Sequence, residues 1–127
     1  MANNMFEKLD ELFSKELKLI LKREQLNEDR IHLYSVGPYW AAFDRSAFLL
    51  EQLTHEEEEP AVLQIQDYPF PIIMHNIHYT QLEKLCLKHR ISKRGLDYLQ
   101  LWVHPLKNSA YNNWYRNYVM EDCLMVE

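Results

Sequence analysis

One segment, residues 31–47, constrains the fold of this chain more than any other part of the sequence. Ile31 to Val36 is short, apolar and aromatic, which is typical of a strand, and Gly37-Pro38 marks a tight turn. Tyr39 to Phe43 follows as a second short strand. The two strands are therefore predicted to pair as a hairpin, with a helix starting directly after it.

Two aromatic residues, Tyr39 and Trp40, open the second strand of this hairpin. Rings beside a tight turn can pack against the sheet and the first helix, or they can form a platform on which a ligand stacks. Both readings are open at the level of sequence, and much of the functional interpretation depends on which one holds.

The length and composition indicate a single domain over residues 1–127. Hydrophobic residues make up 47% of the chain, which is enough for a core, and the presence of only two glycines argues against a disordered chain. The net charge of −5 argues against strong non-specific nucleic-acid binding, because such binding depends on Lys and Arg neutralising phosphates. A local basic patch is compatible with that charge.

Several features point to a cytoplasmic protein without a membrane partner. Cys86 and Cys123 are too few for a disulfide framework, and free thiols fit a reducing compartment. The first residues lack the positive start and apolar run of a signal peptide. No apolar run approaches the roughly 18 residues that a membrane-spanning helix needs.

Helical periodicity or end signals appear in four segments. The clearest runs from Asn4 to about Gln25, where apolar residues recur every three or four positions and Asn4 with Glu7 resembles a capping box. Asp44 and Asn76 are predicted to cap two further helices. These helices are expected at 44–53 and 77–88, and a C-terminal aromatic helix is expected at 109–121.

Strands are predicted in addition to the hairpin, at 61–66, 69–75 and 96–103, and a basic turn is predicted at 90–95. The strands therefore come in neighbouring pairs separated by single helices. This order predicts an α+β fold, in which helices pack on a single mixed or mostly antiparallel sheet of about five strands.

The order of elements and two local patterns resemble the N-terminal mismatch-recognition domain, domain I, of the MutS DNA-repair family. That family carries a strand, then Gly-Asp-Phe-Tyr-Glu and a helix; here the run is Gly37-Pro38-Tyr39-Trp40-Ala41. Its Ile-Pro-Tyr-His run opens a later helix, and Ile77-His78-Tyr79-Thr80 occupies that place here. The similarity covers about residues 31–103 and implies a MutS-domain-I-like core.

The departures from the family pattern alter the implied function. The family's phenylalanine wedges against a mispaired base and its glutamate hydrogen-bonds that base; these positions fall on Tyr39 and Ala41. Tyrosine retains the capacity to stack, which contributes about 1–3 kcal/mol per base, whereas alanine has no side-chain hydrogen bond to offer. The chain also has no phosphate-binding glycine-rich loop. The resemblance therefore implies a stand-alone module without the ATPase.

No residue pattern in the sequence indicates an enzyme, a metal site or a cofactor. His75 and His78 are three residues apart, but no third ligand accompanies them, so capping or surface roles are expected. Cys86 has the spacing of a small buried residue. We therefore expect no catalytic residues, no metal and no cofactor.

Two functional hypotheses follow. The first is a non-catalytic binding or adaptor module whose partner is a protein or a second copy of the chain. Its interface would use the aromatic residues of the C-terminal helix: Tyr111, Trp114, Tyr115 and Tyr118. The second is a nucleic-acid-binding accessory protein that uses an aromatic wedge and a basic turn: Tyr39, Trp40, Lys93 and Arg94.

Overall fold

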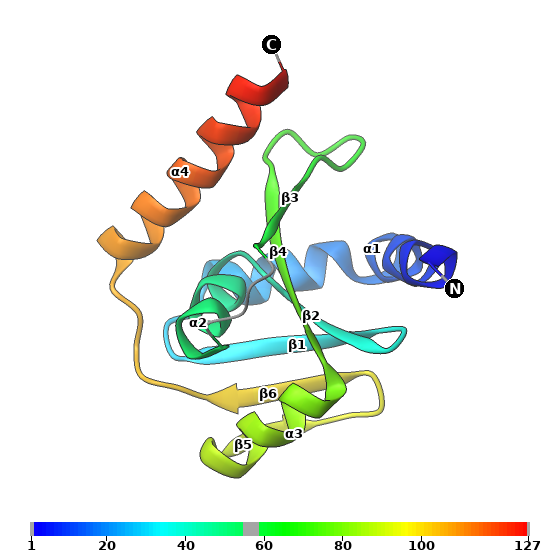
Figure 1. Ribbon diagram of the computed structural model, residues 1–127, viewed down its shortest axis with the longest axis vertical. Coiled ribbons are helices and arrows are strands. Elements are labelled where there is room, and N and C mark those ends of the chain that lie inside the picture. The colour runs from blue at the N-terminus through cyan, green and yellow to red at the C-terminus, as the bar shows by residue number, and fades with distance from the viewer. Residues whose placement is uncertain (1, 55–58, 127) are drawn as a thin grey trace.

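The computed structural model describes residues 2–54 and 59–126, with side chains described for 6–54 and 59–120. Within these residues the α+β class is confirmed, since helices pack on a single sheet (Figure 1). The elements in chain order are α1 (Ala2–Gln25), β1 (Arg30–Val36), β2 (Tyr39–Phe43), α2 (Asp44–Thr54), β3 (Ala61–Leu63), β4 (Ile72–His78), α3 (Tyr79–Lys88), β5 (Ile91–Arg94), β6 (Tyr98–Trp102) and α4 (Asn108–Val126).

The sheet of the described residues has six strands in the order β3-β4-β2-β1-β6-β5, and every neighbouring pair is antiparallel. The additional strand is β5, in the segment predicted as a basic turn. Lys93 pairs with Gln100 and Arg94 with Leu99. Charged residues suit this place because β5 is an edge strand, and edge cations discourage unwanted pairing with another sheet.

The predicted β1–β2 hairpin is present. Tyr34 lies opposite Ala41 and Val36 lies opposite Tyr39, so the reversal occurs at Gly37 and Pro38. Gly37 has a φ of 64°, in the left-handed region that glycine adopts without a steric cost. The hairpin is central in the sheet, because β1 also pairs with β6 and β2 also pairs with β4.

Two of the predicted helix caps, Asn76 and Asn4, do not cap the helices assigned to them. Asn76 lies inside β4, opposite Ala41, because pairing with β2 extends that strand to His78. His78 is the residue that caps α3, in a capping box with Gln81, whose Oε1 accepts the His78 backbone N–H at 3.0 Å. At the other end of the chain, α1 begins at Ala2, so Asn4 is within the helix.

Hydrophobic clusters fill both sides of the sheet. Side chains of consecutive strand residues point to opposite faces, so Leu33 and Tyr34 of β1 belong to different clusters. The Leu33 side packs against α2, α3 and the start of α4, and the Tyr34 side packs against α1. Figure 1 shows α1 and α2 on the two sides of the strands.

Candidate functional site

On the α1 side, the helix does not extend over the whole sheet. It packs over β1 and β2, and its core cluster includes Ile72 and Met74 of β4. Among the described residues, no helix packs over the same side of β5 and most of β6, where Trp102 is 37% exposed. We call this surface the open face; it comprises Arg23 at the border of α1, Arg30 and His32 of β1, Ser92 and Lys93 of β5, and Tyr98, Gln100 and Trp102 of β6.

Two arginine–aromatic stacks dominate the open face. Arg30 and Trp102 are directly opposite on β1 and β6, and the Arg30 guanidinium carbon lies 3.4 Å from the Trp102 ring centroid. Arg23 of α1 lies 4.1 Å from the Tyr98 ring centroid in the same way. Cation–π attraction holds each guanidinium over its ring. The Arg30 side chain is 30% exposed, its Nη1 lies 3.4 Å from Asp29 Oδ1, and its Nε is buried without a hydrogen-bond partner.

A chain of hydrogen bonds fixes the rings and amides beneath these stacks. Ser92 Oγ donates to Gln100 Oε1 at 2.9 Å, and Gln100 Nε2 donates to the Tyr98 hydroxyl at 2.7 Å. The Tyr98 hydroxyl lies 2.6 Å from His32 Nδ1. Burial, with the nearby charges of Arg23 and Arg30, lowers the pKa of His32 to about 4. The imidazole is therefore neutral at physiological pH, and its Nδ1 accepts the Tyr98 proton.

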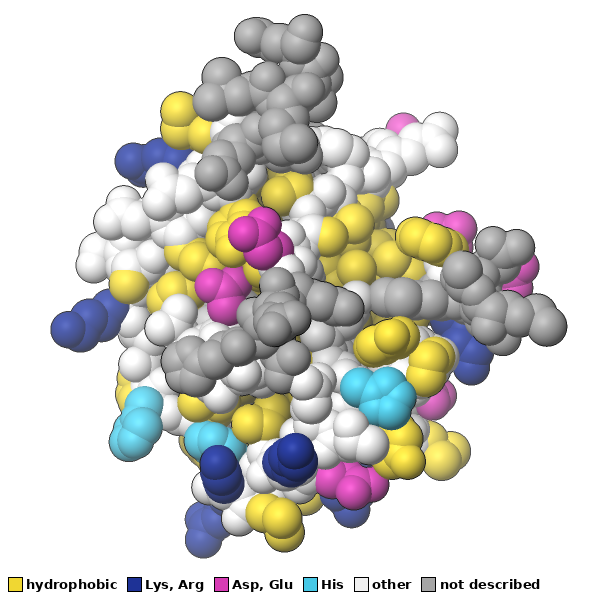
Figure 2. Space-filling view, in the orientation of Figure 1, with side chains coloured by type: hydrophobic (Ala, Val, Ile, Leu, Met, Phe, Trp, Pro, Cys, Tyr) yellow, Lys and Arg dark blue, Asp and Glu magenta, His cyan; other side chains and the backbone are white. Residues whose placement is uncertain are grey.

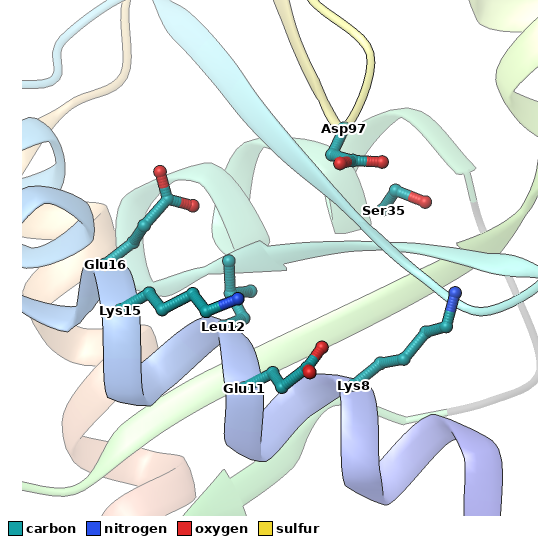
Figure 3. A pocket seen from close by; sticks show the side chains of 7 residues that line it. All are labelled: Lys8, Glu11, Leu12, Lys15, Glu16, Ser35 and Asp97. Atoms are coloured by element: carbon teal, nitrogen blue, oxygen red, sulfur yellow. The ribbon is translucent and has the colours of Figure 1, made fainter.

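A groove of about 180 Å³ runs along α1, between that helix and the segments that carry Ser35 and Asp97 (Figure 3). Charged side chains of α1 extend from one wall toward Ser35 and Asp97 on the other. The lining carries two lysines and three acidic side chains: Lys8, Lys15, Glu11, Glu16 and Asp97. Because these charges nearly balance, the groove does not favour an anion. The positive part of this side is at Arg23, Arg30 and Lys93.

A second polar cluster joins α1 to the start of α2, and it was not predicted from the sequence. Glu24 is 3% exposed and accepts hydrogen bonds from Ser46 N at 2.7 Å and Ser46 Oγ at 2.6 Å. Asn27 Nδ2 and the backbone N–H of His32 donate to Ser46 Oγ at 3.1 and 2.9 Å. Burial raises the pKa of Glu24 to about 8.

Asp44 does not cap α2 as predicted. Its φ is 46°, and Oδ1 accepts the backbone N–H of Ile73 at 2.9 Å, so it ties α2 to β4, while Glu24 satisfies the N-terminal amide of α2. Burial raises the pKa of Asp44 to about 6. Both carboxyl groups line a cavity of about 380 Å³ with Arg45, Tyr68 and Tyr111. Within the described residues, no group of three or more His, Cys, Asp or Glu side chains is placed to hold a metal ion.

The predicted aromatic pair is divided between the two sides of the sheet. Trp40 lies opposite Ile77 and packs against the core cluster beneath α2 and α3. Tyr39 lies opposite His78 on the other side, and the two rings meet edge to face with centroids 5.7 Å apart. Both rings are half-buried, so they do not form one exposed platform. His75 and His78 are likewise on opposite faces of β4, since their strand positions differ by three.

The predicted basic pair is also divided. Lys93 and Arg94 are both exposed, but their partners Gln100 and Leu99 point to opposite sides of the sheet. Lys93 therefore belongs to the open face and Arg94 to the other side. Figure 2 shows Lys and Arg side chains gathered over the α3 and β5 end of that other side.

The predicted aromatic residues of α4 pack in part on their own domain. Tyr111 is buried, and the Trp114 ring centroid lies 5.4 Å from that of Phe48 on α2. The Tyr115 hydroxyl donates to Pro71 O at 2.5 Å, and Tyr118 donates to Glu51 at 3.3 Å. These contacts fix the first half of α4; an interface made by the same residues stays a prediction.

Comparisons of the chain with models of protein families, with curated proteins and with solved structures find no match. The resemblance to MutS domain I rests on the residue pattern and stays a prediction. Among the helices of the described residues, none has the length and apolar character needed to cross a membrane. The cytoplasmic location also stays a prediction.

Proposed function

We propose that this protein is a non-catalytic binding module whose open face holds single-stranded nucleic acid. The observation that carries the proposal is the pair of arginine–aromatic stacks, Arg30 on Trp102 and Arg23 on Tyr98. Bases stack on aromatic rings and on guanidinium planes, while the N–H edges of the same guanidinium groups contact phosphates. Two such stacks on a rigid sheet provide both kinds of contact at neighbouring positions.

The remaining side chains of the open face suit the same ligand. Lys93 adds a third cation, and the hydrogen bonds of Ser92 and Gln100 hold Tyr98 in place. Tyr, Trp and Arg are common on both kinds of surface, but lysine is depleted in protein–protein interfaces and is a frequent phosphate contact. Lys93 is therefore the residue of the open face that favours a nucleic acid over a protein.

The test is fluorescence anisotropy with labelled single-stranded DNA and RNA of about 16 nucleotides. This length is at the upper end of the site sizes that one small single-strand-binding domain covers. Trp102→Ala is expected to weaken binding about tenfold or more, since each stacked base contributes about 1–3 kcal/mol. Phe70→Ala is the matched control, because Phe70 is 62% exposed outside the open face, and it is expected to bind as the wild type does.

Other outcomes would contradict the proposal. It is wrong if no single strand binds at low salt, or if Phe70→Ala weakens binding as much as Trp102→Ala. Loss of binding in Tyr39→Ala, with binding by Trp102→Ala unchanged, would show that the binding site is at Tyr39, the position of the MutS-like wedge, and not at the open face. A duplex of the same sequence is expected to compete poorly, because its bases are already stacked on one another.

A protein-adaptor role through α4 is the second candidate. Figure 1 shows α4 running outward from the sheet, and Met120 on it is 56% exposed. Met120, together with the partly exposed Trp114 and Tyr118 of the same helix, would form the apolar surface for this association. Light scattering is expected to show a dimer that Met120→Glu disperses, with Lys107→Glu, in the segment before α4, as the control. A monomer at all concentrations would contradict self-association.

A further inference from the structure

An apolar cavity of about 280 Å³ opens on the side of the molecule away from the open face. It lies between α2, the segment that joins β6 to α4, and the first turn of α4. Phe48 forms its buried base, and Leu53, Val103 and Leu106 form its walls. A cavity with such walls is suited to an aliphatic group and not to a sugar or a peptide backbone.

The rim of this cavity is basic and polar. His89, at the end of α3, and His104 and Lys107, in the segment before α4, line it together with Gln52. None of the described residues that line the cavity is acidic. His89, His104 and Lys107 make no side-chain hydrogen bond or ion pair within the described part of the chain. Three basic side chains are thus available at the entrance of an apolar chamber.

We infer that this cavity binds a medium-chain alkyl carboxylate, with the chain inside and the carboxylate at the Lys107 rim. An aliphatic interior excludes water from the chain, and a cation with imidazole N–H groups complements one negative head group. The volume of about 280 Å³ is close to the lower limit of small-molecule pockets, about 300 Å³. Octanoate, one short alkyl chain with one carboxylate, is therefore the probe.

The experiment is an NMR titration of the full chain with octanoate, below its micelle concentration. Octanoate is expected to shift the amide signals of residues 48–53 and 103–110. Hexanoate is expected to bind about fifteenfold more weakly, because each buried methylene contributes about fourfold. Octanol, which lacks the charge, is expected to bind more weakly than octanoate, and octyltrimethylammonium is expected not to bind.

Variants distinguish the contribution of the apolar cavity to binding from that of the basic rim. Ala110→Phe places a ring in the mouth of the cavity and is expected to abolish binding of both octanoate and octanol. Asn113→Phe is the matched control, because Asn113 is exposed on the same helix and does not line the cavity. Lys107→Met is expected to weaken octanoate several-fold and to leave octanol unchanged.

Four results would overturn the inference. These are the absence of octanoate-induced shifts, shifts that persist in Ala110→Phe, equal binding of octanol and octanoate, and an acetylated peptide ending in leucine that binds at least tenfold more tightly than octanoate. The last result would assign the cavity to the chain terminus of a protein partner. Binding of single strands at the open face is expected to be unchanged in Ala110→Phe, so the two proposals fail independently.

Discussion

Glu24 is the residue whose chemistry departs furthest from what its type suggests. Its carboxyl group is buried, it bonds Ser46 at the start of α2, and its pKa is raised to about 8. In the unfolded chain the same group ionises near pH 4.5. Between these values the folded state binds the proton and the unfolded state does not, so rising pH favours unfolding.

The resulting prediction concerns stability against pH. The free energy of unfolding is expected to fall as the pH rises from about 6.5 to about 8, because the folded pKa of Glu24 is raised to about 8. Below pH 6.5 the lowered pKa of His32, about 4, opposes the raised pKa values of Glu24 and Asp44. Glu24→Gln cannot ionise, so its stability should change little between pH 6 and 8. Urea unfolding at several pH values measures this. A wild type that gains stability over the same range would contradict the assignment.

The element that organises the sheet is the β1–β2 hairpin, and its turn depends on one backbone conformation. Gly37 has a φ of 64°, and a Cβ built there meets no atom within 4 Å. Gly95, before β6, lacks a left-handed φ, and its Cβ would meet Tyr98 O at an ordinary 3.7 Å. The two glycines of the chain thus differ in backbone strain and hardly at all in crowding.

This difference gives a matched pair of variants. Gly37→Ala is expected to lower the free energy of unfolding by about 1 kcal/mol, because an L-residue in the left-handed region carries a steric cost. Gly95→Ala should change stability by less than about 0.5 kcal/mol, since it reduces the freedom of the unfolded chain without strain. Thermal or urea unfolding compares them. Equal losses in both variants would show that the turn does not depend on its backbone conformation.

At the scale of the whole molecule, charge is unevenly distributed. The net charge is −5, yet Arg23, Arg30 and Lys93 gather on the open face, and the acidic groove residues lie further along α1. A net negative molecule repels nucleic acid in general and attracts it only at a local positive surface. We therefore expect weak binding that is confined to one face.

Salt dependence tests this distribution. With about three phosphate contacts, the logarithm of the association constant for single strands should fall with the logarithm of the salt concentration at a slope of about −2. Binding at 200 mM salt should therefore be about fifteenfold weaker than at 50 mM salt. Lys93→Ala should make the slope shallower by about 0.7. Lys84→Ala, on the exposed surface of α3, should leave it unchanged. A slope near zero would mean that the surface does not contact phosphates.

The turn and the apolar patterns within short segments were predicted correctly, whereas the three predicted helix caps, Asn4, Asp44 and Asn76, were wrong. The turn at Gly37 and the apolar stretches beside it predicted the hairpin, and the periodic stripe of the first helix predicted α1 to within two residues of its start. Prediction failed where a strand lacks an apolar pattern, as in β5, or where pairing with a neighbour extends it, as β2 extends β4 to His78. In those places the backbone conformation depends on hydrogen bonds to a neighbouring strand and not on the local preferences of the residues.

The candidate site was predicted only in part, because it depends on strands that are distant in the chain. The sequence predicts Lys93 at a binding surface, whereas no sequence pattern links Arg30 to Trp102. Neither residue forms a motif by itself; they meet because β6 pairs with β1 in one register. The alternation of strand side chains also separated Tyr39 from Trp40 and Lys93 from Arg94.

The sequence by itself determined the class of fold, the hairpin and the helices, because these follow from turn residues and apolar periodicity within short segments. The tertiary structure decided the order of the strands and the part of the sheet that α1 leaves open. It also decided that Glu24 closes the start of α2. These features arise from contacts between segments that are far apart in the chain. Burial and strand register determine such contacts, and the local preferences of the residues do not predict them.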